Sequence, residues 1–289
     1  MPSDTPRSVT PPSPAATKVR PAAARCVDSA IDLAGGNKVA VRMYGRKKAG
    51  HIAPVVVHFH GGAFVSGDLD NGCTVGNLLE GAGAVVVSVA YPLTPFPQPV
   101  DTGYDVLKWV HRNRTKLGGQ GALVYLAGEE AGGNLAAAVA LMARDQSHPP
   151  LAGQILLSPM LDPCVGSASQ RRMTGDAVDC KWVEGWRNFL RCPRDAEHPY
   201  AVPASAHRLA GLPPTLVLVG DTDPMRDEAL AYAARLRAAG LQVTQHVFAK
   251  AEKWPEPLLE TGPHECPCAG AVQEEFRRFF EATRCRESS

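Results

Sequence analysis

Short apolar runs alternate with longer amphipathic stretches from about residue 50 to the end of the chain. The runs Val55-Val56-Val57 and Leu216-Val217-Leu218-Val219 are apolar at every position, which is typical of strands covered by helices on both faces. The pattern predicts strands over 54–59, 84–89, 122–127, 154–158, 214–219 and 242–248, and helices over 101–116, 131–144, 228–239 and 271–283. This alternation predicts an α/β fold with a mostly parallel central sheet and right-handed crossovers.

Two segments depart from the alternation. Residues 1–24 are rich in Pro, Ser, Thr and Ala, a composition that favours a disordered lead-in. Residues 160–205 carry two tryptophans, several prolines and charges of both signs. We interpret this second segment as a cap inserted over the carboxyl edge of the sheet, within a single domain of residues 25–289.

Composition excludes several classes of partner. Thirty basic residues stand against 29 acidic ones, so charge gives no reason to expect nucleic acid or an anionic membrane as a partner. The start of the chain lacks the apolar stretch of a signal peptide, and no apolar run is long enough to span a bilayer. We therefore expect a cytoplasmic protein with reduced thiols.

No cofactor or metal is expected. The eight cysteines contain no C-x-x-C pair, and the pair Cys266 and Cys268 offers too few ligands for a metal site. The sequence also lacks a phosphate-cradling loop and the glycine fingerprint of a dinucleotide site. The expected partner is a small-molecule substrate or ligand, and a homodimer is the expected assembly if the chain associates with itself.

The most informative motif is Gly128-Glu129-Glu130-Ala131-Gly132. It matches the strand-to-helix turn G-x-S-x-G, in which the central side chain is held on a strained backbone at the carboxyl end of a sheet. Glutamate stands at the central position, where the motif has serine.

Three further motifs agree with this turn. His60-Gly61-Gly62-Ala63-Phe64 follows the first strong strand, and its amides can approach an oxygen closely because glycine has no Cβ. Asp223 follows a predicted strand and can orient a histidine, although it could equally cap the next helix. His264 lies in a loop between the last strand and the last helix. The order Glu130, Asp223, His264 is the order of nucleophile, acid and base on this type of fold.

Together these motifs resemble the hormone-sensitive-lipase-like branch of the α/β-hydrolase superfamily, which contains bacterial esterases. The resemblance covers roughly residues 50–283 and rests on four segments, 60–64, 88–93, 128–134 and 223–228. It implies hydrolysis of carboxylic esters, with Asp223 and His264 as acid and base and with the amides of Gly61, Gly62 and Ala131 as the oxyanion hole. The nucleophilic serine of the family corresponds to Glu130.

Glutamate changes the chemistry expected at this turn. A carboxylate, with a pKa of about 4, is a better leaving group than an alkoxide, so an adduct with an ester would mostly expel Glu130 again. A general base suits it better: Glu130 would remove a proton from carbon or water while the glycine loop holds the oxyanion, in a hydrolase or a lyase or dehydratase. We also expect Glu130, Asp223 and His264 to form an ion-paired trio in which the pKa of the histidine is raised. The alternative is a hydrolase homologue without catalysis that binds a small molecule or a partner.

Overall fold

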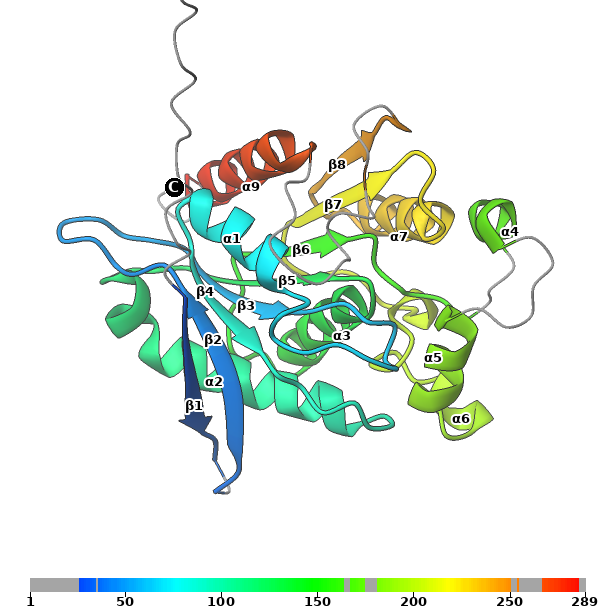
Figure 1. The fold of residues 1–289 in the computed structure, drawn as a ribbon, viewed down its shortest axis with the longest axis horizontal. Helices are drawn as coiled ribbons and strands as arrows, with labels where there is room; N and C mark the ends of the chain where they lie inside the picture. Colours follow the sequence, from blue (N-terminus) through cyan, green and yellow to red (C-terminus); the bar gives the residue numbers. More distant parts are fainter. Residues whose placement is uncertain are drawn as a thin grey trace, which may run out of the picture.

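An eight-stranded sheet forms the centre of the molecule (Figure 1). The computed structural model describes residues 26–34, 36–163, 167–174, 181–250, 254 and 267–285. The strand order is β1-β2-β4-β3-β5-β6-β7-β8, in which β1 and β2 run antiparallel to their neighbours and all other pairs are parallel. The strands are β1 (Cys26–Asp32), β2 (Lys38–Tyr44), β3 (Val55–Phe59), β4 (Val85–Val89), β5 (Val124–Glu129), β6 (Gly153–Leu157), β7 (Thr215–Gly220) and β8 (Val243–Phe248).

Helices cover both faces of this sheet. α2 (Gln98–Gly118), α3 (Ala131–Asp145) and α7 (Arg226–Ala238) lie on one face, and α1 (Cys73–Gly81) and α9 (Ala269–Arg284) lie on the other (Figure 1). Successive residues of β3 alternate between the two layers: Val55 and Val57 join the core under α2 and α3, and Val56 joins the core under α1 and α9. Both faces of the parallel strands are therefore buried, as their continuous apolar runs require.

The chain between β6 and β7 forms α4 (Ala168–Thr174), α5 (Lys181–Phe189), α6 (Pro193–Ala196) and a 3-10 helix (Pro203–Ser205). These short helices lie in the segment where the sequence predicts a cap. Figure 1 shows α5 and α6 beyond the ends of the strands and not against a face of the sheet. This segment therefore brings its own side chains to the carboxyl edge.

The α/β fold and its mostly parallel sheet are confirmed, and each predicted strand and helix is present within a few residues of its expected bounds. Outside the cap segment, three further elements of the described chain, β1, β2 and α1, were not predicted. β1 is an edge strand with residues 27–30 exposed, so its sequence carries no apolar run. Residues 1–24, for which the sequence predicts a lead-in, lie outside the described residues.

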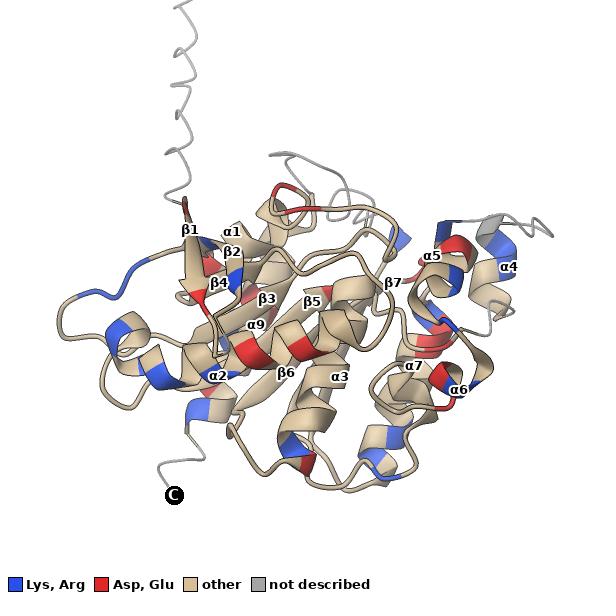
Figure 2. Cartoon of the chain, turned by 90° about the horizontal axis from the view of Figure 1, so that it is seen from below, with Lys and Arg blue, Asp and Glu red and all other residues tan. Residues whose placement is uncertain are grey.

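Charges of both signs are scattered over the helices and loops in the view of Figure 2. Within the part of the chain that the structure describes, no helix is long and apolar enough to cross a membrane.

The expectation of reduced thiols is wrong for one residue, because Cys268 is disulfide-bonded. The thiols of Cys26, Cys73 and Cys192 are not in disulfides.

Candidate functional site

Glu130 lies on a strained turn between β5 and α3. Its backbone has φ 53° and ψ −116°, a region that residues other than glycine rarely adopt. The two flanking glycines leave no room for a side chain: a Cβ on Gly128 would lie 2.1 Å from the carbonyl oxygen of Gly132, and a Cβ on Gly132 would lie 2.0 Å from that of Phe59. The turn predicted from the sequence is therefore present, with a glutamate at its tip.

The carboxylate of Glu130 contacts the glycine loop that follows β3. Its Oε2 accepts hydrogen bonds from the amides of Gly62 at 2.8 Å and Ala63 at 3.1 Å. Gly62 has φ +119°, and a Cβ there would lie 2.1 Å from the carbonyl oxygen of Ser66, so this position requires glycine. The two loop amides thus already hold an anionic oxygen, which belongs to the protein itself.

The first turn of α5 binds the other oxygen of the same carboxylate. Trp182 Nε1 donates to Glu130 Oε1 at 2.7 Å, and Lys181 Nζ lies 2.9 Å from that oxygen. The side chain of Glu130 is 2% exposed, whereas that of Lys181 is 50% exposed. Four donors from two separate segments therefore converge on one buried carboxylate, which links the cap segment to the strained turn.

Gly61 has a different partner from its two successors in the loop. Its amide donates to Glu129 Oε1 at 3.2 Å. Glu129 Oε2 lies 2.7 Å from His58 Nε2, and His58 Nδ1 lies 2.9 Å from Ser88 Oγ. These three side chains are at most 1% exposed and come from the neighbouring strands β5, β3 and β4. They form a buried polar chain that fixes the base of the glycine loop.

His60 is held inside the loop by a stacked tyrosine. Its ring lies 4.3 Å from the ring of Tyr91, with 17° between the planes, and the Tyr91 hydroxyl donates to the His60 carbonyl oxygen at 2.8 Å. Burial lowers the pKa of His60 because it disfavours the charged imidazolium. The loop is therefore fixed at the residue that precedes its glycines.

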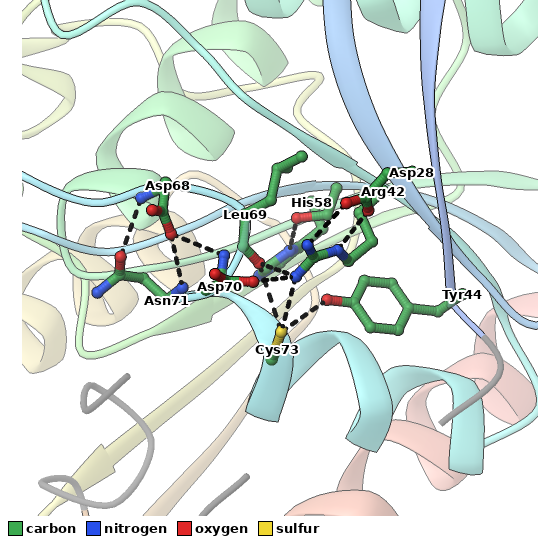
Figure 3. Close-up of polar contacts among 10 residues, drawn as sticks. Asp28, Arg42, Tyr44, His58, Asp68, Leu69, Asp70, Asn71 and Cys73 are labelled. Atoms are coloured by element: carbon green, nitrogen blue, oxygen red, sulfur yellow. Dashed lines mark hydrogen bonds and ion pairs between the residues drawn. The ribbon is translucent and has the colours of Figure 1, made fainter. Parts of the chain in front are cut away.

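The segment after the loop is anchored to the antiparallel edge of the sheet (Figure 3). Arg42 on β2 bonds Asp28 on β1 at 2.6 and 2.9 Å and Asp70 at 2.6 Å, and it lies 3.1 Å from Cys73 Sγ. The hydrogen bonds that Arg42 donates to Asp28 raise the pKa of Arg42. This cluster ties Asp70 and Cys73, which follow the glycine loop, to the edge strands.

Asp223, the expected triad acid, is buried and already accepts three hydrogen bonds. Met225 N donates to Oδ1 at 2.8 Å, and Oδ2 accepts from the hydroxyl of Ser158 and, at 3.2 Å, from Trp254 Nε1. Burial raises the pKa of Asp223, and the hydrogen bonds from Ser158, Met225 and Trp254 oppose that shift. Asp223 thus follows β7 with an indole as one of its donors, and its role as triad acid stays a prediction.

The catalytic and oxyanion roles expected for the six site residues stay predictions. His264 lies outside the described residues, so the predicted trio with Glu130 and Asp223 is untested. Ala131 is fully buried as the first residue of α3, and the role expected for its amide stays a prediction. Within the described ranges no three His, Cys, Asp or Glu side chains converge to hold a metal ion.

The sequence did not assign the contacts of Lys181, Trp182 and Ala63 with Glu130, nor the pairing of Glu129 with His58. One signal was available: His58 interrupts the apolar run Val55–Phe59, and a histidine inside a buried strand needs a hydrogen-bonding partner. No comparable signal marks Lys181 and Trp182, because their contact depends on how α5 packs.

Known proteins resemble this chain in sequence and in structure. A family model described as alpha/beta hydrolase fold matches residues 56–252. The esterase LipI of Mycobacterium tuberculosis is 34% identical over 232 residues, which is 77% of this chain and 72% of that esterase. The gibberellin receptor GID1C of Arabidopsis thaliana is 37% identical over 211 residues, which is 67% of this chain and 60% of the receptor.

A solved esterase structure gives the same family assignment as these sequence relatives. The esterase of Pyrobaculum calidifontis superposes with a TM-score of 0.76 at 32% identity, over 89% of this chain and 85% of that esterase. This likeness extends beyond the residues that the family model matches. The chain therefore belongs to the α/β-hydrolase family, in the branch that contains carboxylesterases.

Proposed function

We propose that this protein binds a small molecule on an esterase scaffold and does not hydrolyse esters at the turn that carries Glu130. One observation carries the proposal: the Glu130 carboxylate accepts the amide hydrogen bonds of Gly62 and Ala63. In an esterase of this fold such amides stabilise the oxyanion that develops on the substrate. Here they are engaged before any substrate arrives.

The chemistry of glutamate points the same way. Ester hydrolysis through a covalent intermediate requires a nucleophile that stays attached after it attacks the carbonyl carbon, and a carboxylate is the better leaving group in the adduct. A substrate oxyanion would also have to replace a carboxylate that four donors hold. Both effects oppose ester hydrolysis through Glu130.

The relatives support a binding role on this scaffold. Their names include both carboxylesterases and a gibberellin receptor, so the family contains proteins named for catalysis and proteins named for recognition. A receptor-like role needs the scaffold and a pocket but not the nucleophile. We extend only this general role to the present chain, with a small molecule as the ligand.

General-base catalysis by Glu130 is the second candidate. The observation that favours it is the strained backbone at Glu130, because such strain concentrates at active sites. For this role the carboxylate would have to leave the loop amides, Lys181 and Trp182, so that the amides can hold the substrate oxyanion. The products would be those of a lyase, a dehydratase or an unusual hydrolase.

The test is a comparison of wild type with Glu130→Gln on short p-nitrophenyl esters, together with a ligand screen by thermal shift. We expect both proteins to hydrolyse the esters no faster than buffer, and ligands to raise the melting temperature of wild type by mass action. Ester turnover by wild type that Glu130→Gln abolishes would refute the proposal. Exchange of solvent deuterium into a carbonyl compound, again lost in Glu130→Gln, would establish the general base.

Location and assembly are further proposals. We propose a cytoplasmic protein that forms a homodimer, for which sedimentation of the full chain is the test. Disulfides are rare in the cytosol, so the proposed location predicts that Cys268, which is disulfide-bonded in the structure, is reduced in the cell. Counting reactive thiols in protein from freshly lysed cells decides whether that disulfide exists where the protein works.

A further inference from the structure

Trp254 is packed tightly beside Asp223, the expected triad acid. Its ring is 4% exposed and stacks on Phe248 with 4.8 Å between centroids and 6° between planes. Gly220 at the end of β7 makes room for it, since a Cβ there would lie 2.4 Å from Trp254 Cδ1. The indole is therefore fixed by packing and not only by hydrogen bonds.

The fixed ring directs its only polar atom at two acceptors. Trp254 Nε1 lies 3.2 Å from Asp223 Oδ2 and 3.1 Å from Ser158 Oγ. Ser158 itself donates to the same Asp223 oxygen, while Met225 N donates to Oδ1. Both oxygens of the buried acid thus have donors, which come from the segments that follow β6, β7 and β8.

An indole cannot replace the histidine of a catalytic triad. In a triad the acid accepts the Nδ1–H of an imidazole whose Nε2 then takes the proton of the nucleophile. An indole Nε1–H only donates, and the ring has no second nitrogen to accept a proton. A hydrogen bond from Trp254 to Asp223 therefore satisfies the acid without producing a base.

We infer that Trp254 is a positioning residue that commits Asp223 to a structural role, so the scaffold has lost its acid–base couple as well as its serine. This inference rests on the proposed function and extends it. It means that placing serine at position 130 does not by itself restore an esterase. The retained aspartate stabilises the junction of β6, β7 and β8.

The first test is the indole Nε1–H signal of Trp254 in the NMR spectrum of the full chain. Trp254→Phe assigns the signal and keeps the stacked ring, and Trp186→Phe assigns a tryptophan of equal burial as control. We expect the Trp254 proton to exchange slowly and to shift in Asp223→Asn, with the Trp186 signal unmoved. Rapid exchange, or a Trp254 signal that Asp223→Asn leaves in place, would overturn the inference. If Asp223→Asn does not fold, Ser158→Ala replaces it, because removing the competing hydroxyl should also shift the Trp254 signal.

The second test is ester hydrolysis by Glu130→Ser, which is separate from the wild-type assay of the proposed function. We expect its rate on p-nitrophenyl acetate to stay within about twofold of wild type, since general-base catalysis alone contributes about 100-fold or more. A gain of about 100-fold that is lost in Glu130→Ser/Asp223→Asn would show a working acid and refute the role of Trp254. A gain that survives Asp223→Asn would also overturn the inference, because serine at position 130 would then restore an esterase without this acid.

Discussion

Glu130 Oε2 accepts a hydrogen bond from the amide of Gly62 at 2.8 Å. The side chain at the tip of the strained turn is therefore bound to the loop that would bind a substrate oxyanion. Because Trp182 and Lys181 hold its other oxygen, the same carboxylate connects β5, the glycine loop and α5. This shared bonding explains how a buried glutamate is tolerated at 1% exposure.

The glycine loop should not tolerate a side chain at position 62. We predict that Gly62→Ala destabilises the fold by more than the control Gly83→Ala, because a Cβ at 62 also meets the carbonyl oxygen of Ser66 at 2.1 Å. Gly83 has φ +97° and open space around it, so its variant measures the backbone strain alone, about 1–3 kcal/mol. Urea unfolding of both variants checks this prediction. Equal losses in the free energy of unfolding would contradict the close approach of position 62 to the Ser66 carbonyl oxygen.

Removing the Glu130 carboxylate should weaken the attachment of α5. Glu130→Ala leaves the amides of Gly62 and Ala63 without their acceptor, and we predict a loss of about 1–3 kcal/mol in the free energy of unfolding. Trp182→Phe keeps the ring and removes one donor, so its effect should be smaller. A double-mutant cycle of the two changes should show coupling, and strictly additive losses would mean that the two side chains do not interact.

The chain of Ser88, His58 and Glu129 should be a large contributor to stability. We predict that His58→Phe costs about 3–5 kcal/mol, because it leaves the buried Glu129 Oε2 without the imidazole that it contacts. His51 is exposed, and His51→Phe should change stability by no more than about 0.5 kcal/mol. Guanidinium unfolding at neutral pH measures the free energy of unfolding of both variants. A loss at position 58 as small as at position 51 would contradict the buried chain.

Glu228 should make stability depend on pH. Burial raises its pKa well above 4.5, and within the described residues its buried Oε1 has no hydrogen-bond partner. The folded state therefore keeps the proton at pH values where the unfolded state has lost it, so the stabilising effect is complete below about pH 4.5 and is lost as pH rises through the raised pKa. Unfolding of wild type and Glu228→Gln from pH 5 to pH 8 should show a steeper decline for wild type. An equal decline of stability with pH in both proteins would contradict the raised pKa of Glu228. Glu281 is exposed, so Glu281→Gln serves as the control and should leave the decline unchanged.

Much of this site could be predicted from local sequence. The turn at Glu130 and the loop at Gly62 follow from glycines whose missing Cβ is required by close backbone approach, and such positions are visible as motifs. The parallel strands follow from continuous apolar runs. β1 could not be predicted in the same way, because an edge strand exposed on both sides needs no apolar pattern.

The contacts within the site could not be predicted from local sequence. Gly61 and Gly62 look equivalent in the motif, yet one donates to Glu129 and the other to Glu130, because the loop backbone decides which amide points where. Lys181 and Trp182 lie 51 and 52 positions beyond Glu130 in the numbering, and only the packing of α5 brings them to it. Trp254 depends likewise on tertiary packing against Phe248 and Gly220.

The most direct test of the account is the position of the Gly62 and Ala63 amide signals in the NMR spectra of wild type and Glu130→Ala. If the Glu130 carboxylate fills the oxyanion site, both signals will move upfield in the variant as they lose an anionic acceptor, while the Gly61 signal, bonded to Glu129, moves much less. Gly62 and Ala63 signals that stay in place in Glu130→Ala would show that the loop amides are free in the wild type, which contradicts the account and leaves the site open for a substrate oxyanion.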